Sequence, residues 1–326
     1  MCKSGDNNKN TYDEMVEECI HADISPGSFA INSVIMNRTV NVIRIQLSEK
    51  SNQYISSLRR YNMEYNELVA LAESGDTKAM QALGHFHSDF GGSKENVDLD
   101  KAEYWMEKSA ECGDVKGMIL TALLCNMDGH VLMQIAPQEW EHAIPKMKKA
   151  LFWAEQALNV GATDAAESCI QAKAQLGRAY MYGGMFSSKN GLCDDTAIKY
   201  LTTSLNYLKE VYGKTKTDDS LFYLGNTLFY LNNYMQRQGK SLKNGDDKLM
   251  ITCLEKYVHA HNYTDSNVGM AYGFLGLLYT FGFGCQIDYS KAVGYYTIAT
   301  EKCNFDCSDD LKHFKKKLFG GYTYIK

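Results

Sequence analysis

The stretch AESGDTKAM at residues 72–80 returns as AECGDVKGM at residues 110–118 and, more loosely, as ALNVGATDA at residues 157–165. The second and third copies follow a Lys-Ala-x-x-aromatic run, KAEYW at 101–105 and KALFW at 149–153. That run recurs as KAVGYY at 291–296 and, loosely, as TAIKY at 196–200. Coincident copies of a multi-part pattern indicate a chain built from internal repeats.

A Leu-Gly pair marks the first half of each unit. It stands at Leu83-Gly84, Leu176-Gly177, Leu224-Gly225 and Leu275-Gly276, and Thr121-Ala122 takes its place in the second unit. Ala79, Ala82, Leu83 and Phe86 recur at helical spacing, which predicts a helix with one apolar face. A glycine inside a helix costs about 1 kcal/mol relative to alanine. We therefore expect a neighbouring helix to approach the backbone closely at these glycines.

The second half of each unit has its own start and stop signals. Asp98 or Asp100 precedes Lys101, and Asp288 precedes Lys291, where an acidic residue favours the start of a helix. Gly75, Gly113 and Gly161 stand where a glycine commonly ends a helix. Each unit is then a helical hairpin with one apolar face, and such units have to stack on one another.

These residues resemble the Sel-one-like repeat, a relative of the tetratricopeptide repeat. The resemblance extends over about residues 66–302 and is specific in the first, third and last units, partial in the second and poor in the fourth. It implies an all-α, right-handed α-solenoid of about five helical hairpins whose first helices line a concave surface that binds other proteins. The intervals between Leu-Gly sites vary, so we expect enlarged loops near residues 128–145, 183–195 and 236–247.

The regions outside the repeats are expected to form a tail and two caps. Residues 1–11 are polar and are predicted to be disordered. Residues 12–65 are predicted to be a helical cap region, although residues 40–47 fit a strand as an alternative. Residues 303–326 are predicted to be a capping helix, opened by Ser308-Asp309-Asp310 and closed by Lys315–Lys317 with Gly320-Gly321.

Composition narrows the class of protein. Only 3 of 326 residues are proline, which disfavours turn-rich β folds, and two of them, Pro137 and Pro145, fall in the largest insertion. The net charge is −5 without a long basic run, so we expect no nucleic-acid partner. The uncharged segment 266–287 carries five glycines and fits the repeat, so we expect no membrane span. With no signal peptide and ten scattered cysteines, a cytoplasmic protein with reduced thiols is expected.

Motifs for chemistry are weak. Gly213-Lys214-Thr215 lacks the first glycine and the preceding strand of a phosphate-binding loop. Cys303, Cys307 and His313 offer three zinc ligands without an evident fourth, and the histidine pairs 85/87 and 259/261 are spaced too far around a helix to share a metal. We therefore expect no catalytic, cofactor or metal site.

The tetratricopeptide analogy places the residue after each Leu-Gly glycine, and the one four positions further on, on the concave surface. In the fourth unit, side chains spaced by three and four residues extend this into a stripe in which asparagines can hold a peptide backbone and tyrosine and arginine can anchor it. The candidate partner-binding groove comprises His85, Asp89, Arg178, Tyr182, Asn226, Tyr230, Asn233, Tyr234 and Arg237. For the tyrosines, the alternative is ordinary packing between repeats. For His85, the alternative is an exposed side chain, with His87 in the packed position of the repeat.

The function expected on this basis is a non-catalytic protein–protein interaction module, an adaptor or scaffold for a peptide or protein of unknown identity. Two alternatives remain open at this point. One is a hydrolase-like enzyme with its site in an enlarged loop or in the N-terminal region. The other is an effector or regulator that acts on a partner protein after export.

Overall fold

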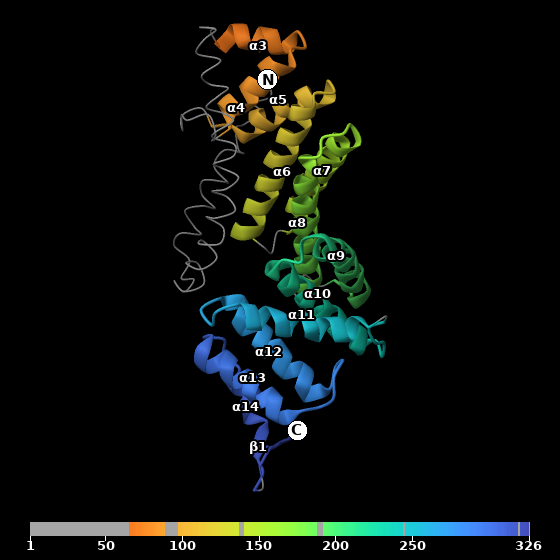
Figure 1. The fold of residues 1–326 in the computed structure, drawn as a ribbon, viewed down its shortest axis with the longest axis vertical. Coiled ribbons are helices and arrows are strands. Elements are labelled where there is room, and N and C mark those ends of the chain that lie inside the picture. The colour runs from red at the N-terminus through yellow and green to blue at the C-terminus, as the bar shows by residue number, and fades with distance from the viewer. Residues whose placement is uncertain are drawn as a thin grey trace, which may run out of the picture. The chain divides into compact units, whose positions relative to one another are not determined.

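The computed structural model describes residues 65–88, 97–136, 140–187, 192–243, 245–318 and 320–325 (Figure 1). These residues form helices that follow one another in chain order and end in a two-stranded hairpin. The expected tail, nearly all of the N-terminal cap region and the candidate residue Asp89 lie outside the described residues.

The helices pair into five antiparallel hairpins, preceded by α3 (Tyr65–Glu73). We call the two helices of each hairpin the first and the second helix. The hairpins are α4 (Thr77–His87) with α5 (Leu99–Glu111), α6 (Val115–Ile135) with α7 (Trp140–Asn159), α8 (Ala165–Phe186) with α9 (Asp194–Thr215), α10 (Asp218–Arg237) with α11 (Asp246–Ala260), and α12 (Ser266–Phe281) with α13 (Tyr289–Lys302). Each helix packs mainly on its neighbours in sequence. The predicted all-α solenoid of about five repeats is confirmed.

The Leu-Gly glycines lie where the two helices of a hairpin touch. A methyl group added at any of these glycines would fall 2.5–2.9 Å from a side chain of the second helix. The pairs are Gly84 with Met106, Gly177 with Leu208, Gly225 with Leu254 and Gly276 with Tyr296. The close approach inferred from the sequence is therefore the reason for a residue that weakens the isolated helix.

This contact predicts opposite effects for two glycine-to-alanine substitutions. Gly276→Ala is expected to destabilise the chain by about 1–3 kcal/mol, because the new methyl group would overlap the buried Tyr296 ring. Gly213→Ala in α9 is expected to stabilise it by about 0.5–1 kcal/mol, since nothing lies within 4 Å of the added Cβ. Urea denaturation of both variants measures the difference, and a stable Gly276→Ala chain would contradict this account of the helix contact.

Aspartates and glycines set the boundaries between helices. Asp98 accepts a hydrogen bond from the backbone of Lys101, and Asp288 accepts from Ser290 and Lys291, so each caps its helix as expected. Asp114 likewise caps α6 by accepting from Gly117. Just before it, Gly113 has a φ of +83°, a left-handed conformation that favours glycine. The Gly-Asp pair of the quoted repeat thus ends one helix and starts the next.

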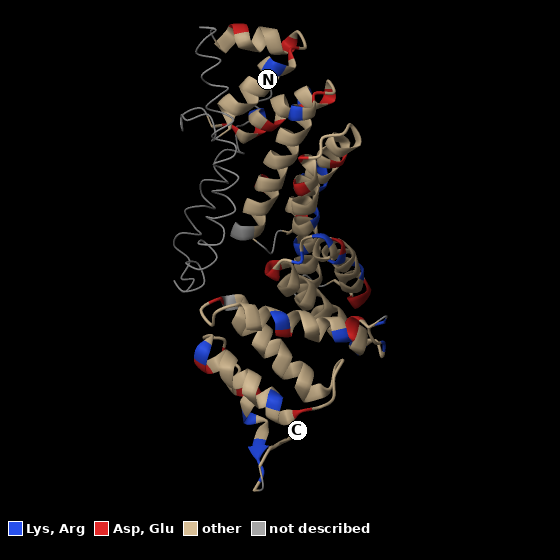
Figure 2. Ribbon diagram, in the orientation of Figure 1, with Lys and Arg blue, Asp and Glu red and all other residues tan. Residues whose placement is uncertain are grey.

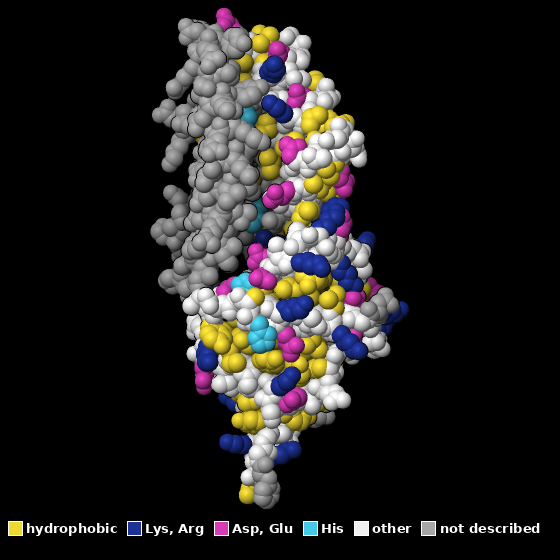
Figure 3. Space-filling model, in the orientation of Figure 1, with side chains coloured by type: hydrophobic (Ala, Val, Ile, Leu, Met, Phe, Trp, Pro, Cys, Tyr) yellow, Lys and Arg dark blue, Asp and Glu magenta, His cyan; other side chains and the backbone are white. Residues whose placement is uncertain are grey.

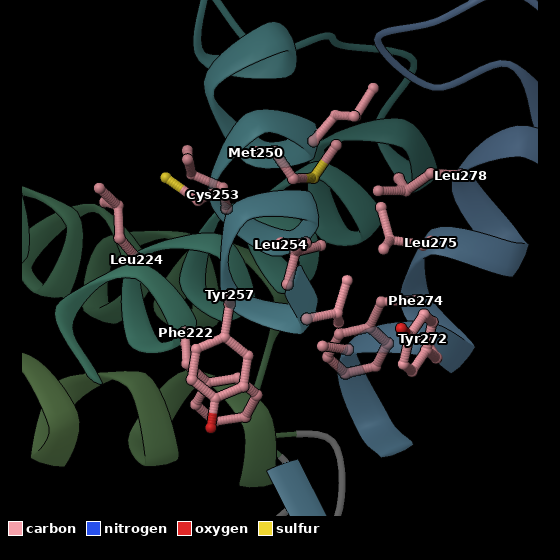
Figure 4. Close-up of a cluster of buried hydrophobic side chains, with 14 of the residues drawn as sticks. Phe222, Leu224, Met250, Cys253, Leu254, Tyr257, Tyr272, Phe274, Leu275 and Leu278 are labelled. Carbon is pink, nitrogen blue, oxygen red and sulfur yellow. The ribbon is translucent and has the colours of Figure 1, made fainter. Parts of the chain in front are cut away.

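The apolar core is continuous from one repeat to the next in the C-terminal half. Figure 4 shows Leu254 of α11 between Leu224 of α10 and Leu275 of α12, with all three side chains fully buried. The surrounding cluster joins side chains from α9 through α13. With a shared core of this kind, each hairpin depends on its neighbours to bury its apolar face.

An ion-pair network ties the first repeat to the second. Charged residues of both signs lie along α5 and α7 (Figure 2). Lys146 and Lys149 of α7 donate to the carboxylate of Glu103 at 2.5 and 2.8 Å, and Lys146 also pairs with Asp128 of α6 at 3.1 Å. Burial works to raise the pKa of Glu103, but the two lysines outweigh it and hold that pKa below its usual value.

Neutralising Glu103 should therefore weaken the contact between these repeats. Glu103→Gln is expected to lower the free energy of unfolding by about 1–3 kcal/mol, because it leaves half-buried lysines without their shared carboxylate. The control is Glu111→Gln, which removes the exposed pair with Lys108 and should change stability by less than about 0.5 kcal/mol. Equal effects of the two variants in thermal denaturation would contradict the role assigned to the network.

The largest expected loop is instead mostly helix. Residues 128–145 lengthen α6 to Ile135 and begin α7 at Trp140, and Pro145 lies inside α7. The extra turns are stabilised by packing, because the buried Trp140 ring lies against Gly183, where an added Cβ would come within 2.9 Å. Tertiary contact here overrides the proline signal that suggested a loop.

The prediction of a C-terminal capping helix is also wrong beyond the first turn of that helix. Helix α14 (Ser308–Lys312) is followed by the antiparallel strands β1 (Phe314–Lys316) and β2 (Tyr322–Tyr324). The physical reason is aromatic packing: the Phe314 and Tyr324 rings pair across the hairpin at 5.4 Å, and Tyr289 of α13 lies 6.0 Å from Phe314. Gly320 and Gly321 adopt positive φ and form the turn.

Candidate functional site: a polar cluster on three successive first helices

Four of the predicted groove residues lie on two adjacent first helices, with Arg178 at their centre. Arg178 and Tyr182 come from α8, and Asn226 and Tyr230 come from α10. The Arg178 guanidinium lies over the ring of Tyr223 at 4.5 Å, and its Nη1 donates to Gln175 Oε1 at 3.2 Å. A guanidinium stacked on a tyrosine ring joins α8 to α10 and holds a positive charge between them.

Helix α6 places a histidine close to the charge of Arg178. His130 is close enough to Arg178 to sense its charge, and the Gln175 side chain acts on both. Burial, followed by the positive charge of Arg178, lowers the pKa of His130 to about 4. The imidazole is therefore neutral at pH 7, and Arg178 alone supplies the positive charge at this point.

Tyrosines surround the guanidinium. Tyr182 influences the pKa values of Arg178, Tyr223 and Tyr230, which places its hydroxyl among them. Burial raises the pKa of Tyr223 to about 12 and also raises that of Tyr230, so both keep their protons. The Tyr230 ring stands edge-on to Phe274 of α12 at 5.8 Å, so this aromatic set reaches the fifth repeat.

Four polar atoms in this region are buried without a hydrogen-bond partner. They are Asn126 Oδ1, His130 Nδ1, Arg178 Nε and Asn226 Oδ1, and we call these four residues the polar cluster. Asn126 and Asn226 are only 7% and 2% exposed. Each such group costs about 1–3 kcal/mol of desolvation unless something binds it. Such atoms therefore make α6, α8 and α10 the place to look for a binding site.

The remaining predicted residues do not join the cluster. Asn233 and Arg237 are exposed near the end of α10, where Arg237 stacks on Tyr234 at 5.0 Å and pairs weakly with Asp194 at 3.8 Å. Tyr234 is buried in the apolar core that α10 shares with the adjacent helices. The predicted stripe along α10 therefore does not form one surface. Its Asn233 and Arg237 face solvent and its Tyr234 lies in the core, apart from Asn226 and Tyr230.

His85 is buried rather than exposed, and burial lowers its pKa. The neighbouring His87 is also buried and shares a 2.9 Å hydrogen bond with the hydroxyl of Tyr65 in α3. The alternative of plain exposure for His85 is therefore wrong, its place in a groove stays a prediction, and no described contact joins it to the polar cluster.

Asn126, His130, Gln175 and Tyr223 were not singled out by the sequence analysis. Helical periodicity offers a signal for two of them, because Gln175 and Tyr223 stand three residues before Arg178 and Asn226 on the same faces. Asn126 and His130 follow Thr121-Ala122, the unit that lacks the Leu-Gly pair, so the repeat register gave no reason to choose them.

Within the described ranges, no group of three His, Cys, Asp or Glu side chains lies close enough to hold a metal ion. Cys303 and Cys307 are buried, and burial raises the pKa of both thiols, that of Cys307 to about 11. His313 instead contacts the backbone oxygen of Ile325 in the hairpin, at 3.2 Å from Nδ1. Among the described helices, none is both long and apolar enough to cross a membrane.

Three segments of the chain match the model of a known repeat. The Sel1 repeat matches residues 77–114, 170–204 and 269–302, which coincide with α4–α5, most of α8 with the first half of α9, and α12–α13. Each of these three segments is similar to one Sel1 repeat. Sel1 repeats indicate a helical-repeat scaffold for protein–protein interaction. Hairpins α6–α7 and α10–α11, which supply His130 and Asn226, lie outside the matched segments.

One similar solved structure is the Sel1 repeat protein from Oxalobacter formigenes. It is 16% identical, with a TM-score of 0.25, and the match covers 78% of this chain and 99% of that one. Among curated proteins, no match to this chain was found.

The buried histidines predict a pH dependence of stability. His130 titrates near 4 in the folded chain and near 6.5 when unfolded, so only the unfolded chain gains a proton between these values. Stability is therefore complete above about pH 6.5 and falls on acidification, with about 1–2 kcal/mol lost by pH 5. His85 adds a loss of the same sign.

Thermal denaturation at pH 7.5 and pH 5 measures this loss. His130→Gln should reduce the difference between the two melting temperatures, because it removes one of the protonation events. His259→Gln, at an exposed position of α11, should leave the difference unchanged. An unaltered pH dependence in His130→Gln would show that the imidazole is not held neutral by its surroundings.

Proposed function

We propose that this chain is a non-catalytic adaptor that binds a peptide or protein segment along its first helices. The observation that carries this proposal is the polar cluster, four buried polar atoms without partners on α6, α8 and α10. A structural core satisfies the large majority of its polar groups internally, and single exceptions such as Trp140 Nε1 lie apart from this cluster. A surface that binds an extended segment supplies those partners from the segment.

The residues around the cluster have the character of interface anchors. Arg178, Tyr182, Tyr223 and Tyr230 provide one guanidinium and three rings from two adjacent helices. Arginine and tyrosine are enriched among residues that dominate binding energy, because they combine a large apolar area with directional donors. Successive first helices present these groups in chain order, which suits an extended partner that contacts several repeats.

We place the adaptor in the cytoplasm, with no cofactor and with a protein as partner. Support for a reduced compartment comes from eight free cysteines among the described residues, five of them buried. The hydrolase alternative gains no support from the polar cluster, since its one cation stands near a neutral imidazole and its other two members are amides, none of which is a nucleophile.

The proposal predicts that partner binding depends on the first helices. With the full chain as bait, a partner is captured, identified by mass spectrometry and purified, and its affinity is measured. Asn226→Ala with Tyr230→Ala is expected to weaken binding by about tenfold or more, since it removes an amide and an anchor ring. The melting temperature of the double variant is measured alongside, to show that the chain remains folded.

The matched control changes two exposed rings on second helices. Tyr104 of α5 and Phe152 of α7 are 53% and 51% exposed, and replacing both with alanine should leave the affinity unchanged. Loss of binding in the control, with full binding retained in the folded Asn226/Tyr230 variant, would place the interface on the second helices and overturn the proposal.

A further inference from the structure

The polar cluster contains a positive charge without a negative partner. Its guanidinium stacks on Tyr223, donates to Gln175 and lies close to Tyr182, all of them neutral groups. The negative charge of Asp219 also acts on it, but from beyond ion-pair contact. No carboxylate within the described residues forms an ion pair with it, and its Nε has no partner. A desolvated guanidinium is costly unless an anion completes it, and a carboxylate matches its planar fork of donors.

The two asparagines add complementary chemistry on the neighbouring helices α6 and α10. Asn126 stands one turn before His130 on α6, and Asn226 stands one turn after Tyr223 on α10. Their unpartnered atoms are the carbonyl oxygens Oδ1, which accept hydrogen bonds. An extended peptide offers backbone N–H donors for such acceptors, together with carboxylates for Arg178.

We propose that the polar cluster binds a carboxylate of a partner peptide at Arg178, with Asn126 and Asn226 accepting hydrogen bonds from the peptide backbone. This inference rests on the proposed function and specifies the chemistry of its partner. The carboxylate comes either from an Asp or Glu side chain or from the C-terminus of the peptide, and the two sources share the same planar, singly charged group.

The charge of the site favours a carboxylate over a phosphate. His130 is neutral, so Arg178 is the one positive charge of the cluster, and the negative charge of Asp219 already acts on it. The site therefore suits a singly charged carboxylate better than a dianion. A phosphate dianion carries more charge than one guanidinium balances and needs further donors. The neighbouring rings of Tyr223 and Tyr230 provide apolar walls that exclude water from the pair and so strengthen it.

Peptide arrays test the proposal with the full-length chain. Two sets of 15-residue peptides of varied sequence are presented, one with free C-terminal carboxylates and one with C-terminal amides. Each binder is then remade with Asp and Glu replaced by Asn and Gln. Binding is expected to fall about tenfold or more when the recognised carboxylate is neutralised. Loss on amidation assigns it to the C-terminus, and loss on Asp/Glu replacement assigns it to a side chain.

The chain provides a matched pair of arginines for the control. Arg178→Gln and Arg237→Gln each remove one positive charge, and each arginine lies over a tyrosine ring of α10. In fluorescence anisotropy with a binding peptide, Arg178→Gln should weaken affinity about tenfold or more, whereas Arg237→Gln should leave it within about twofold. Arg178→Lys, which keeps the charge but not the planar fork, should fall between wild type and Arg178→Gln.

The outcomes separate this inference from the proposed function. Peptides that bind equally well to wild type and to folded Arg178→Gln, or that tolerate loss of every carboxylate, overturn the carboxylate site and leave the adaptor function standing. Equal losses for Arg178→Gln and Arg237→Gln overturn it too, since binding would then follow net charge. A chain that binds no peptide in either set overturns the adaptor function and this inference together.

Discussion

The fold depends on one contact, the close approach of the second helix to the backbone of the first at the Leu-Gly glycine. Gly84, Gly177, Gly225 and Gly276 each leave less than 3 Å between an imagined methyl group and the opposing side chain. The contact sets the spacing within a hairpin, and the adjoining core sets the spacing between hairpins. Where Thr121-Ala122 replaces the pair, the buried Ala122 takes the same place, and Gly129, a further two turns along α6, meets Met147 of α7.

This packing also determines which side chains remain available for binding. The glycine side of each first helix is used against its own second helix, so another face of α6, α8 and α10 is left for polar groups. Arg178 directly follows Gly177, and Asn226 directly follows Gly225, which places both about 100° around the helix from the contact. Burying their unpartnered polar atoms costs free energy of folding, and the apolar core offsets this cost because no hydrogen bond does so at those atoms.

Sequence patterns predicted the repeats well because each signal reflects a local requirement: a glycine for close packing, an aspartate for a helix start, a left-handed glycine for a helix end. The site was only partly predictable. Arg178, Tyr182, Asn226 and Tyr230 followed from the repeat register, whereas the positions of Tyr234 and Arg237 depended on how α10 packs against other helices. The hairpin at Phe314–Tyr324 was missed because a pattern of acidic start and basic end also fits a helix, and long-range aromatic contacts decide between the two.

The irregular second unit explains how the histidine enters the cluster. Helix α4 ends at His87, three residues beyond its packing glycine, whereas α6 continues for thirteen residues beyond Ala122. His130 stands on these added turns, eight residues past Ala122, at a position that the shorter α4 does not possess. The extension in turn requires Trp140 and α7 to cover it, which is why the inserted residues fold as helix rather than loop. The added turns of α6 thus bring His130 close enough to Arg178 to sense its charge.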